Sequence, residues 1–372
     1  INTGTISALG STAVTDSEVT DGGEGGEGGY VNIFVGGGEG GTNLETPRMI
    51  NTGSIIVDGG NSAFDDYDAG DGGAIYIGAS DSYDGGESYI NPILVAISGN
   101  ISANGGNTTG TTDSGSGNAG DGGYISIAHQ SQIASQFTTQ IVGYTDIDVS
   151  GGAGHIARRG GYIDIYTYSN SDDGYQTAFA PAAPINIKTN LTLNAGEVVT
   201  EGELTATPAG SYGGYLDIYI DTGFASLQEN LDIVFDGVVS ANGSNVSNGN
   251  TSNGGSFSVG AVHDADVSGE FYLRGGSDTA IPEEGEDDGY NEGRQGGDFY
   301  IESTFGMASV NATVVASGGD GQIEGGEGGY VEIYSAQGGK IRGDFDVTGG
   351  NAATSEINEE DTLGGSGGNI YA

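Results

Sequence analysis

The chain has 372 residues, of which 75 are glycine and 6 are proline, and 8 Lys/Arg face 52 Asp/Glu for a formal net charge of −44. The glycines do not recur at every third position, which excludes collagen, and the charge opposes binding to nucleic acid and to anionic membranes. There is no cysteine for a disulfide. No apolar run reaches the roughly 18 residues of a membrane span, so we expect no membrane insertion.

One short phrase recurs along the chain: two glycines followed by alternating apolar residues, as in Gly28-Gly29 before Tyr30–Phe34. Successive copies lie 32 to 53 residues apart. The nine copies begin at Gly28, Gly72, Gly122, Gly160, Gly213, Gly254, Gly296, Gly328 and Gly367. Alternation with a period of two predicts β-strands with one buried face.

A second strand is predicted between neighbouring copies, from a pair of apolar residues two positions apart, and it is usually followed by Gly-Gly or Asn-Gly. The pairs are Ile6/Ala8, Ile55/Val57, Ile101/Ala103, Ile147/Val149, Leu191/Leu193, Val239/Ala241, Phe271/Leu273, Val314/Ala316 and Phe345/Val347. A weaker third strand precedes several pairs, as in Leu94–Ile97 and Ile185–Ile187. No stretch has helical spacing, so an all-β fold is expected.

Each repeat offers only a few inward side chains and cannot close a core alone. Stacking equivalent strands would bury a continuous apolar column and satisfy the backbone groups of neighbouring repeats, about 4.8 Å apart. This favours one parallel β-solenoid domain of nine Gly-rich repeats over residues 1–372. An antiparallel sandwich is the alternative, but it does not require the same phrase nine times.

The phrases G-x-I-x-A-x-G-G and G-G-x-I-x-I, separated by acidic Gly-rich loops, resemble right-handed parallel β-helix repeat proteins. These are the pectate-lyase-like superfamily and, more closely, secreted bacterial adhesins and autotransporter passengers. The resemblance covers the whole chain and concerns its architecture. It implies a right-handed parallel β-helix (β-solenoid) of about nine coils, acting as a rigid stalk in an extracellular or cell-surface location.

The paired glycines are interpreted as architecture. Glycine accepts positive φ where a strand turns sharply, and stacked turns leave little room for a Cβ. A phosphate-binding loop is excluded because no helix follows the glycines.

Acidic residues stand directly before several of the glycine pairs. Glu27, Asp71, Asp121 and Glu327 share this position, and their carboxylates together with loop carbonyls are suitable ligands for calcium. One interpretation is a calcium cofactor, with these four residues as metal ligands. The other interpretation, favoured because neither the EF-hand pattern nor the nine-residue RTX repeat is present, is a set of solvated acidic loops.

The strand after each glycine pair has outward positions that carry aromatic and acidic residues. The aromatic positions are Tyr30, Tyr124, Tyr162, Tyr215 and Tyr330, then Phe34, Tyr166, Tyr219 and Tyr334, with Asn32, Asp164, Asp217 and Glu332 between them. Stacked repeats would align these side chains in columns. The columns are either a structural aromatic ladder or a contact face for a neighbouring subunit or a glycan.

We expect no enzymatic activity. Pectate-lyase-like enzymes combine calcium-binding acids with a basic residue, and here only His155 with Arg158 and Arg159 form a local basic cluster. A net charge of −44 would also repel an anionic polysaccharide.

Both ends of the chain are in phase with the repeat and carry no obvious cap. The leading functional hypothesis is a structural subunit of an extracellular filament or surface fibre, assembled head to tail with itself. The alternative is a calcium-stiffened adhesin segment that binds glycans or another cell. A polysaccharide lyase or hydrolase is the third hypothesis.

Overall fold

The computed structural model describes most of the chain. The described residues are 4–13, 23–36, 48–63, 67–80, 93–97, 99–108, 117–131, 139–169, 184–199, 209–221, 231–246, 250–278, 292–352 and 363–372. These residues form β-strands and extended connections, and they contain no helix, as the sequence predicts.

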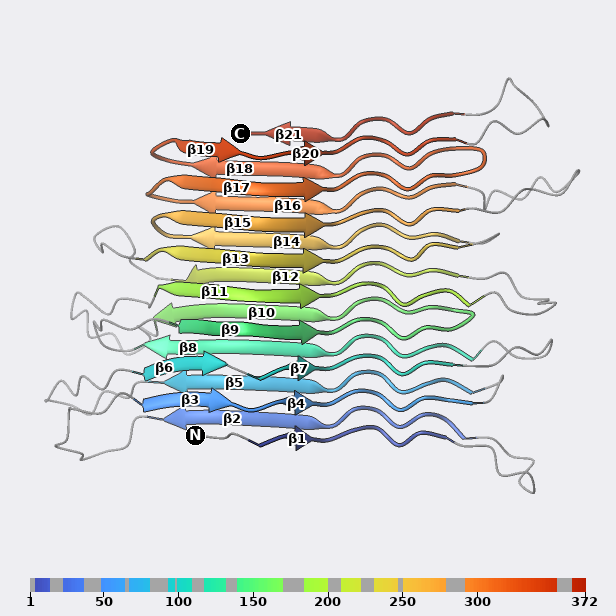
Figure 1. Ribbon diagram of the computed structural model, residues 1–372, viewed down its shortest axis with the longest axis horizontal. Helices are drawn as coiled ribbons and strands as arrows, with labels where there is room; N and C mark the ends of the chain where they lie inside the picture. The colour runs from blue at the N-terminus through green and yellow to red at the C-terminus, as the bar shows by residue number, and fades with distance from the viewer. Residues whose placement is uncertain are drawn as a thin grey trace, which may run out of the picture.

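The strands form two sheets (Figure 1). The first sheet contains β1 (Ile6–Ser7), β3 (Arg48–Thr52), β4 (Ile55–Ile56), β6 (Ile93–Ile97), β7 (Ile101–Ser102), β9 (Thr139–Asp148), β11 (Ile185–Thr192), β13 (Ile233–Ser240), β15 (Ala265–Tyr272), β17 (Ala308–Val315), β19 (Gly339–Arg342) and β20 (Phe345–Asp346). The second contains β2 (Tyr30–Gly36), β5 (Ala74–Ser80), β8 (Tyr124–Ser131), β10 (Tyr162–Ser169), β12 (Tyr215–Asp221), β14 (Ser256–Ala261), β16 (Asp298–Ser303), β18 (Tyr330–Ser335) and β21 (Asn369–Tyr371).

The chain alternates between the sheets, and each strand pairs in parallel with its equivalent in the neighbouring repeat (Figure 1). In the second sheet the register is one to one, so Ile163 of β10 lies opposite Ile125 of β8 and Leu216 of β12. The first sheet has one register shift, between β9 and β11 near Ile187. The prediction of parallel strands in regular repeats is confirmed. This pairing excludes the alternative of an antiparallel sandwich.

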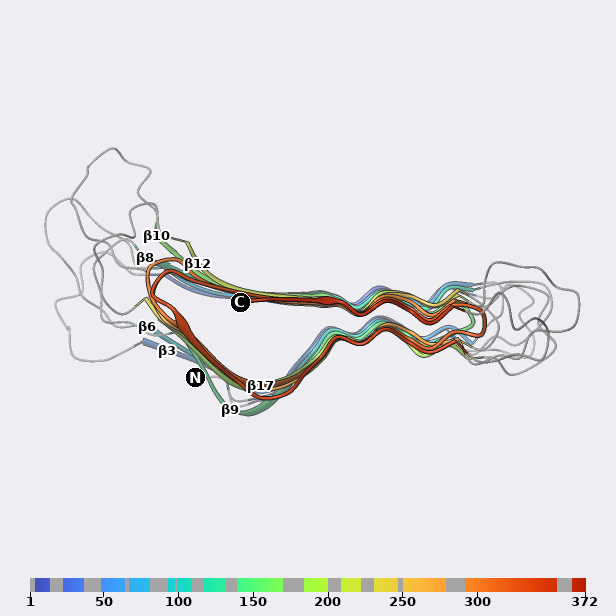
Figure 2. The same ribbon diagram turned by 90° about the horizontal axis from the view of Figure 1, so that it is seen from above.

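The two layers separate on one side of the stack and enclose the apolar core; we call this side the apolar lobe (Figure 2). The expected pairs point inward there: Ile55 and Val57 are fully buried, as are Leu193 and Val239. Ile6, Ala8, Phe345 and Val347, in the outermost pairs, are only partly buried.

Isoleucines dominate the core in the early repeats, whereas four phenylalanines meet in the later ones. Phe257 of β14 lies 4.6 Å from Phe271 and 5.3 Å from Phe299, measured between ring centroids, and Phe235 completes the cluster. All four rings are buried. Such a contiguous set of large side chains supplies much of the hydrophobic stabilisation of the later repeats.

On the other side of the stack the layers run close together as the glycine arm (Figure 2). It consists of the stretches between a first-sheet strand and the next second-sheet strand, such as 58–63 with 67–73 and 104–108 with 117–123. Backbone hydrogen bonds of 2.8–2.9 Å cross between its layers in a zigzag. Donor first, they join Gly26 to Ser11, Gly60 to Gly26, Gly70 to Gly60, Gly106 to Gly70, Gly120 to Gly106 and Gly152 to Gly120.

The glycines of the arm are required for close approach. A Cβ added to Gly120 would overlap the carbonyl of Gly70. The expectation of positive φ at the paired glycines is wrong: among the described glycines only Gly269, Gly338 and Gly343 have it. The glycines serve close packing instead, because the two layers of the arm undulate side by side and lie one against the other (Figure 2).

Candidate functional site

The outer face of the second sheet carries the predicted columns. The first outward position reads Tyr30, Ala74, Tyr124, Tyr162, Tyr215, Ser256, Asp298, Tyr330 and Asn369 along the stack. Tyr30, Tyr124, Tyr162 and Tyr215 are therefore brought to one end of the column. Tyr330 is separated from them by Ser256 and Asp298.

Tyrosine rings contact one another in this column. The rings of Tyr124 and Tyr162 are nearly parallel, at 5°, with centroids 5.5 Å apart. At the third outward position Tyr166 and Tyr219 repeat this geometry at 5.2 Å and 5°. Tyr334 lies in the same row but is separated from Tyr219 by Gly260 and Glu302.

Two tyrosines of the middle outward position also belong to the array, and the sequence argument did not include them. Tyr76 lies 5.1 Å from Tyr30 and 5.4 Å from Tyr124, and so bridges the gap left by Ala74. Tyr300 lies 5.9 Å from Tyr334. The signal was present in the sequence, because both residues occupy the position taken by Asp164 and Asp217 in other repeats.

The residues before the glycine pairs form a second column. The amide N–H of the first glycine of each pair donates to the carbonyl of the residue that precedes the glycine pair in the next repeat. Gly28 donates to Asp71 in this way, and Gly72 donates to Asp121. Along the stack the column reads Glu27, Asp71, Asp121, Arg159, Tyr212, Asn253, Gln295, Glu327 and Ser366.

The four predicted calcium ligands therefore do not meet at one point. Glu327 is five repeats from Asp121, about 24 Å at the spacing of parallel strands. Within the part of the chain that the structure describes, no cluster of three or more His, Cys, Asp or Glu residues could hold a metal ion.

The carboxylates of Asp71 and Asp121 have partners within the stack. Asp71 Oδ1 accepts the backbone N–H of Asp121 at 2.8 Å, and Asp121 Oδ2 accepts from Arg159 Nε at 3.1 Å. The same device recurs elsewhere: Asp58 Oδ1 accepts the N–H of Asn104 at 2.8 Å. Acceptors of this kind fix the register between neighbouring repeats.

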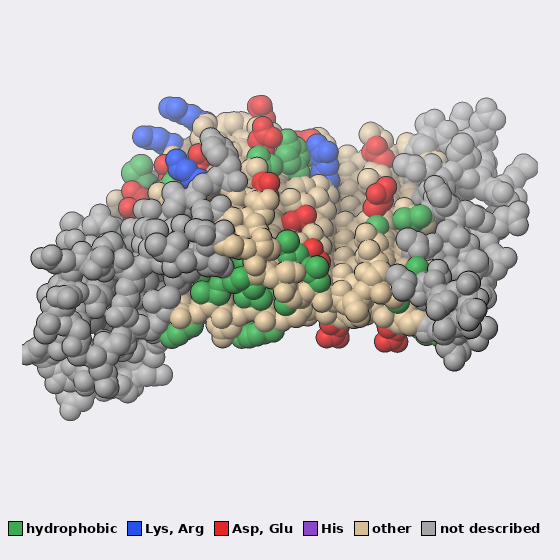
Figure 3. All heavy atoms as spheres, turned by 60° about the horizontal axis from the view of Figure 1, so that its bottom comes forward, with side chains coloured by type: hydrophobic (Ala, Val, Ile, Leu, Met, Phe, Trp, Pro, Cys, Tyr) green, Lys and Arg blue, Asp and Glu red, His purple; other side chains and the backbone are tan. Residues whose placement is uncertain are grey.

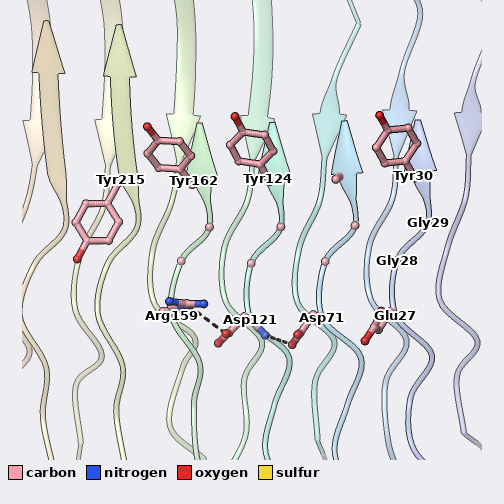
Figure 4. A pocket seen from close by; sticks show the side chains of 17 residues that line it. Glu27, Gly28, Gly29, Tyr30, Asp71, Asp121, Tyr124, Arg159, Tyr162 and Tyr215 are labelled. Atoms are coloured by element: carbon pink, nitrogen blue, oxygen red, sulfur yellow. Dashed lines mark hydrogen bonds and ion pairs between the residues drawn. The ribbon is translucent and has the colours of Figure 1, made fainter. Parts of the chain in front are cut away.

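A groove of about 570 Å³ lies between two rows of side chains. The acidic row is Glu27, Asp71 and Asp121, and the tyrosine row is Tyr30, Tyr124, Tyr162 and Tyr215. In Figure 4 the side chains of Glu27, Asp71 and Asp121 form one wall, the rings of Tyr124 and Tyr162 form part of the other, and glycine pairs lie between them. The space-filling view in Figure 3 shows acidic side chains scattered over the face that it presents, with few basic ones.

Asp164 and Asp217 lie side by side at the middle position of β10 and β12. Burial, together with the negative charge of Asp217, raises the pKa of Asp164 to about 6. Tyr162 donates its hydroxyl to Asp217 Oδ2 at 2.7 Å. Burial and this hydrogen bond raise the pKa of the Tyr162 phenol well above its usual range, and burial raises that of Tyr219 to about 12.

The structure places His155 and Arg159, two members of the predicted basic cluster, in different surroundings. His155 is buried, whereas the Arg159 side chain is largely exposed and pairs with Asp121. The two residues therefore lie in different environments.

The chain matches no protein-family model, no curated protein and no solved structure. None of the residues that the structure describes lies in a helix that is long and apolar enough to cross a membrane.

Proposed function

We propose that the chain is a structural segment of an extracellular filament or surface fibre, built as a right-handed β-helix of about nine coils. The continuity of the stack carries the proposal. Both sheets pair in parallel from repeat to repeat, and the glycine arm adds backbone bonds between the layers. An assembly of this kind transmits load along its axis and suits a stalk.

Self-association would extend the same pairing. At one end of the stack, β21 and the neighbouring loop expose Ile370, Tyr371 and Leu363, and β19 exposes Ile341. An open strand edge with apolar side chains is a template for a further parallel strand. The charge of −44 disfavours lateral aggregation, which leaves axial contact as the favoured mode.

Electron microscopy and sedimentation of the purified protein, with calcium added and with calcium chelated, test this proposal. We expect rods longer than one stack, which Ile370→Lys shortens or disperses by placing a charge on the exposed edge. Tyr212→Lys, at an exposed position in the middle of the stack, is the matched control. Dispersed short particles under both conditions would overturn the self-assembly.

The second candidate function is an adhesin segment that binds glycans, and the groove between the acidic and tyrosine rows favours it. Aromatic rings and carboxylates are the groups with which proteins bind sugar rings and their hydroxyls. A glycan array would test it. Binding that Tyr124→Ala abolishes, without self-assembly, would favour the adhesin over the filament.

A further inference from the structure

One carboxylate oxygen on the tyrosine face is buried without a partner. Asp164 is only 8% exposed, and its Oδ1 makes no hydrogen bond. Native proteins pair nearly all buried polar atoms, and an exception calls for a water molecule or an ion as the explanation.

A second carboxylate lies beside it. Asp217 is the register partner of Asp164 on the adjacent strand β12. Tyrosine hydroxyls contact the Oδ2 atom of each carboxylate. Tyr162 donates to Asp217 Oδ2 at 2.7 Å, and the Tyr124 hydroxyl lies 3.5 Å from Asp164 Oδ2. These bonds leave the Oδ1 of Asp164 unpaired.

No basic side chain compensates the pair in the described structure. The ion pairs found there join Arg159 to Asp121 and Arg294 to Glu292. The titratable groups that interact with Asp164 are Tyr124 from β8, Tyr162 on its own strand, and Asp217 and Tyr219 from β12. Asp164 is buried and Asp217 is partly buried, so the two carboxylates repel each other when both are ionised, and a positive species between them would remove that cost.

We propose that Asp164 and Asp217 bind one divalent cation of the calcium class between them. Neighbouring parallel strands are about 4.8 Å apart, so equivalent oxygens on the two strands lie at about this separation. An ion between two such oxygens has bonds of about 2.4 Å, which is the calcium distance, whereas magnesium requires about 2.1 Å. Water molecules complete the shell, because calcium takes six to eight oxygen ligands.

This site differs from the acidic column before the glycine pairs. Asp71 and Asp121 already accept a backbone N–H and an arginine, so their carboxylates act within the stack. The proposal is also independent of the filament: a stack without this ion still pairs through its backbone.

Terbium luminescence tests the site. Tb³⁺ substitutes for calcium and is excited by nearby tyrosines, and Tyr124 and Tyr162 lie against both carboxylates. We expect saturable emission that calcium displaces at lower concentration than magnesium. Asp164→Asn and Asp217→Asn should each weaken binding at least tenfold, and Asp71→Asn should leave it unchanged.

Two further measurements complete the test. Circular dichroism of the Asn variants should show an intact fold, because each substitution removes one of two adjacent negative charges and keeps the size of the side chain. Terbium binding should weaken as the pH falls through about 6, where Asp164 takes up a proton. The proposal is overturned if wild-type protein gives no displaceable emission, or if both Asn variants bind like the wild type. Neither result would bear on rod formation.

Discussion

The apolar lobe and the glycine arm are built from the same two layers but are held together by different forces (Figure 2). In the lobe the layers separate, and buried Ile, Val, Leu and Phe side chains fill the space. In the arm the layers bond directly through backbone N–H and C=O groups at the glycines, and only scattered side chains such as Ser62, Ala119 and Val246 are buried there. The lobe can therefore relax around a smaller side chain, whereas glycines at the backbone contacts of the arm, such as Gly120, have no space for an additional atom.

The largest expected effect is in the arm. Gly120→Ala places a Cβ on the carbonyl of Gly70, with the amide nitrogen of Gly106 only 2.8 Å away. Backbone cannot move aside as a side-chain end can, so we expect a loss of about 4 kcal/mol or more in the free energy of unfolding, measured by urea titration.

Gly364→Ala is the matched control for this substitution. The Cβ of this variant would meet nothing nearer than the Gly350 carbonyl oxygen at 4.0 Å. Equal stability of the two variants would show that the arm is not tightly packed.

The next effect concerns the lobe. Phe257→Ala empties the centre of the phenylalanine cluster and should cost about 3–5 kcal/mol, without preventing folding. Phe34→Ala, at a side chain that is 62% exposed, should change the stability by less than about 1 kcal/mol in the same thermal or urea melt. A small loss at Phe257 would mean that the lobe depends on backbone bonds as the arm does.

A smaller effect appears as a pH dependence on the outer face of the lobe. The pKa of Asp164 is raised from 3.8 to about 6, so the folded protein holds a proton that the unfolded chain releases between these values. In the absence of divalent cations the free energy of unfolding should therefore increase as the pH falls from 6 to 4, by about 2 kcal/mol from this group.

Asp164→Asn should remove that contribution and stabilise the protein at pH 8. The difference between the urea midpoints of wild type and variant, followed against pH, measures it. Parallel pH profiles of the two proteins would contradict the assignment.

The smallest expected effect is the coupling free energy between stacked tyrosine rings on the outer face of the second sheet. The rings of Tyr166 and Tyr219 stack at 5.2 Å on the surface of the lobe. A double-mutant cycle with alanine at both positions should give a coupling of about 0.5–1.5 kcal/mol. The pair Tyr166 and Tyr334, in the same row but in separate clusters, serves as the control and should show no coupling.

Period-two alternation and the nine glycine phrases were sufficient to predict parallel strands and the inward pairs such as Ile55 and Val57, because strand periodicity and burial are local properties. The glycine arm was not predicted, since direct backbone contact between layers leaves no pattern other than glycine itself. The sequence showed that Glu27, Asp71, Asp121 and Glu327 share one position in their repeats, but the metal-ligand hypothesis did not consider how far apart the stack places Asp121 and Glu327. Arg159, which follows Asp121 in that column, was visible in the sequence and shows that the row is interrupted.

The bonds between repeats have a mechanical consequence. In a parallel stack they run along the axis, so a pull on the two ends of the chain acts on one repeat boundary at a time. Each repeat of 32 to 53 residues would release roughly 110 to 190 Å of extended chain when it peels away. A stalk built in this way would absorb a sudden force in successive steps, with the repeats still stacked continuing to bear the tension.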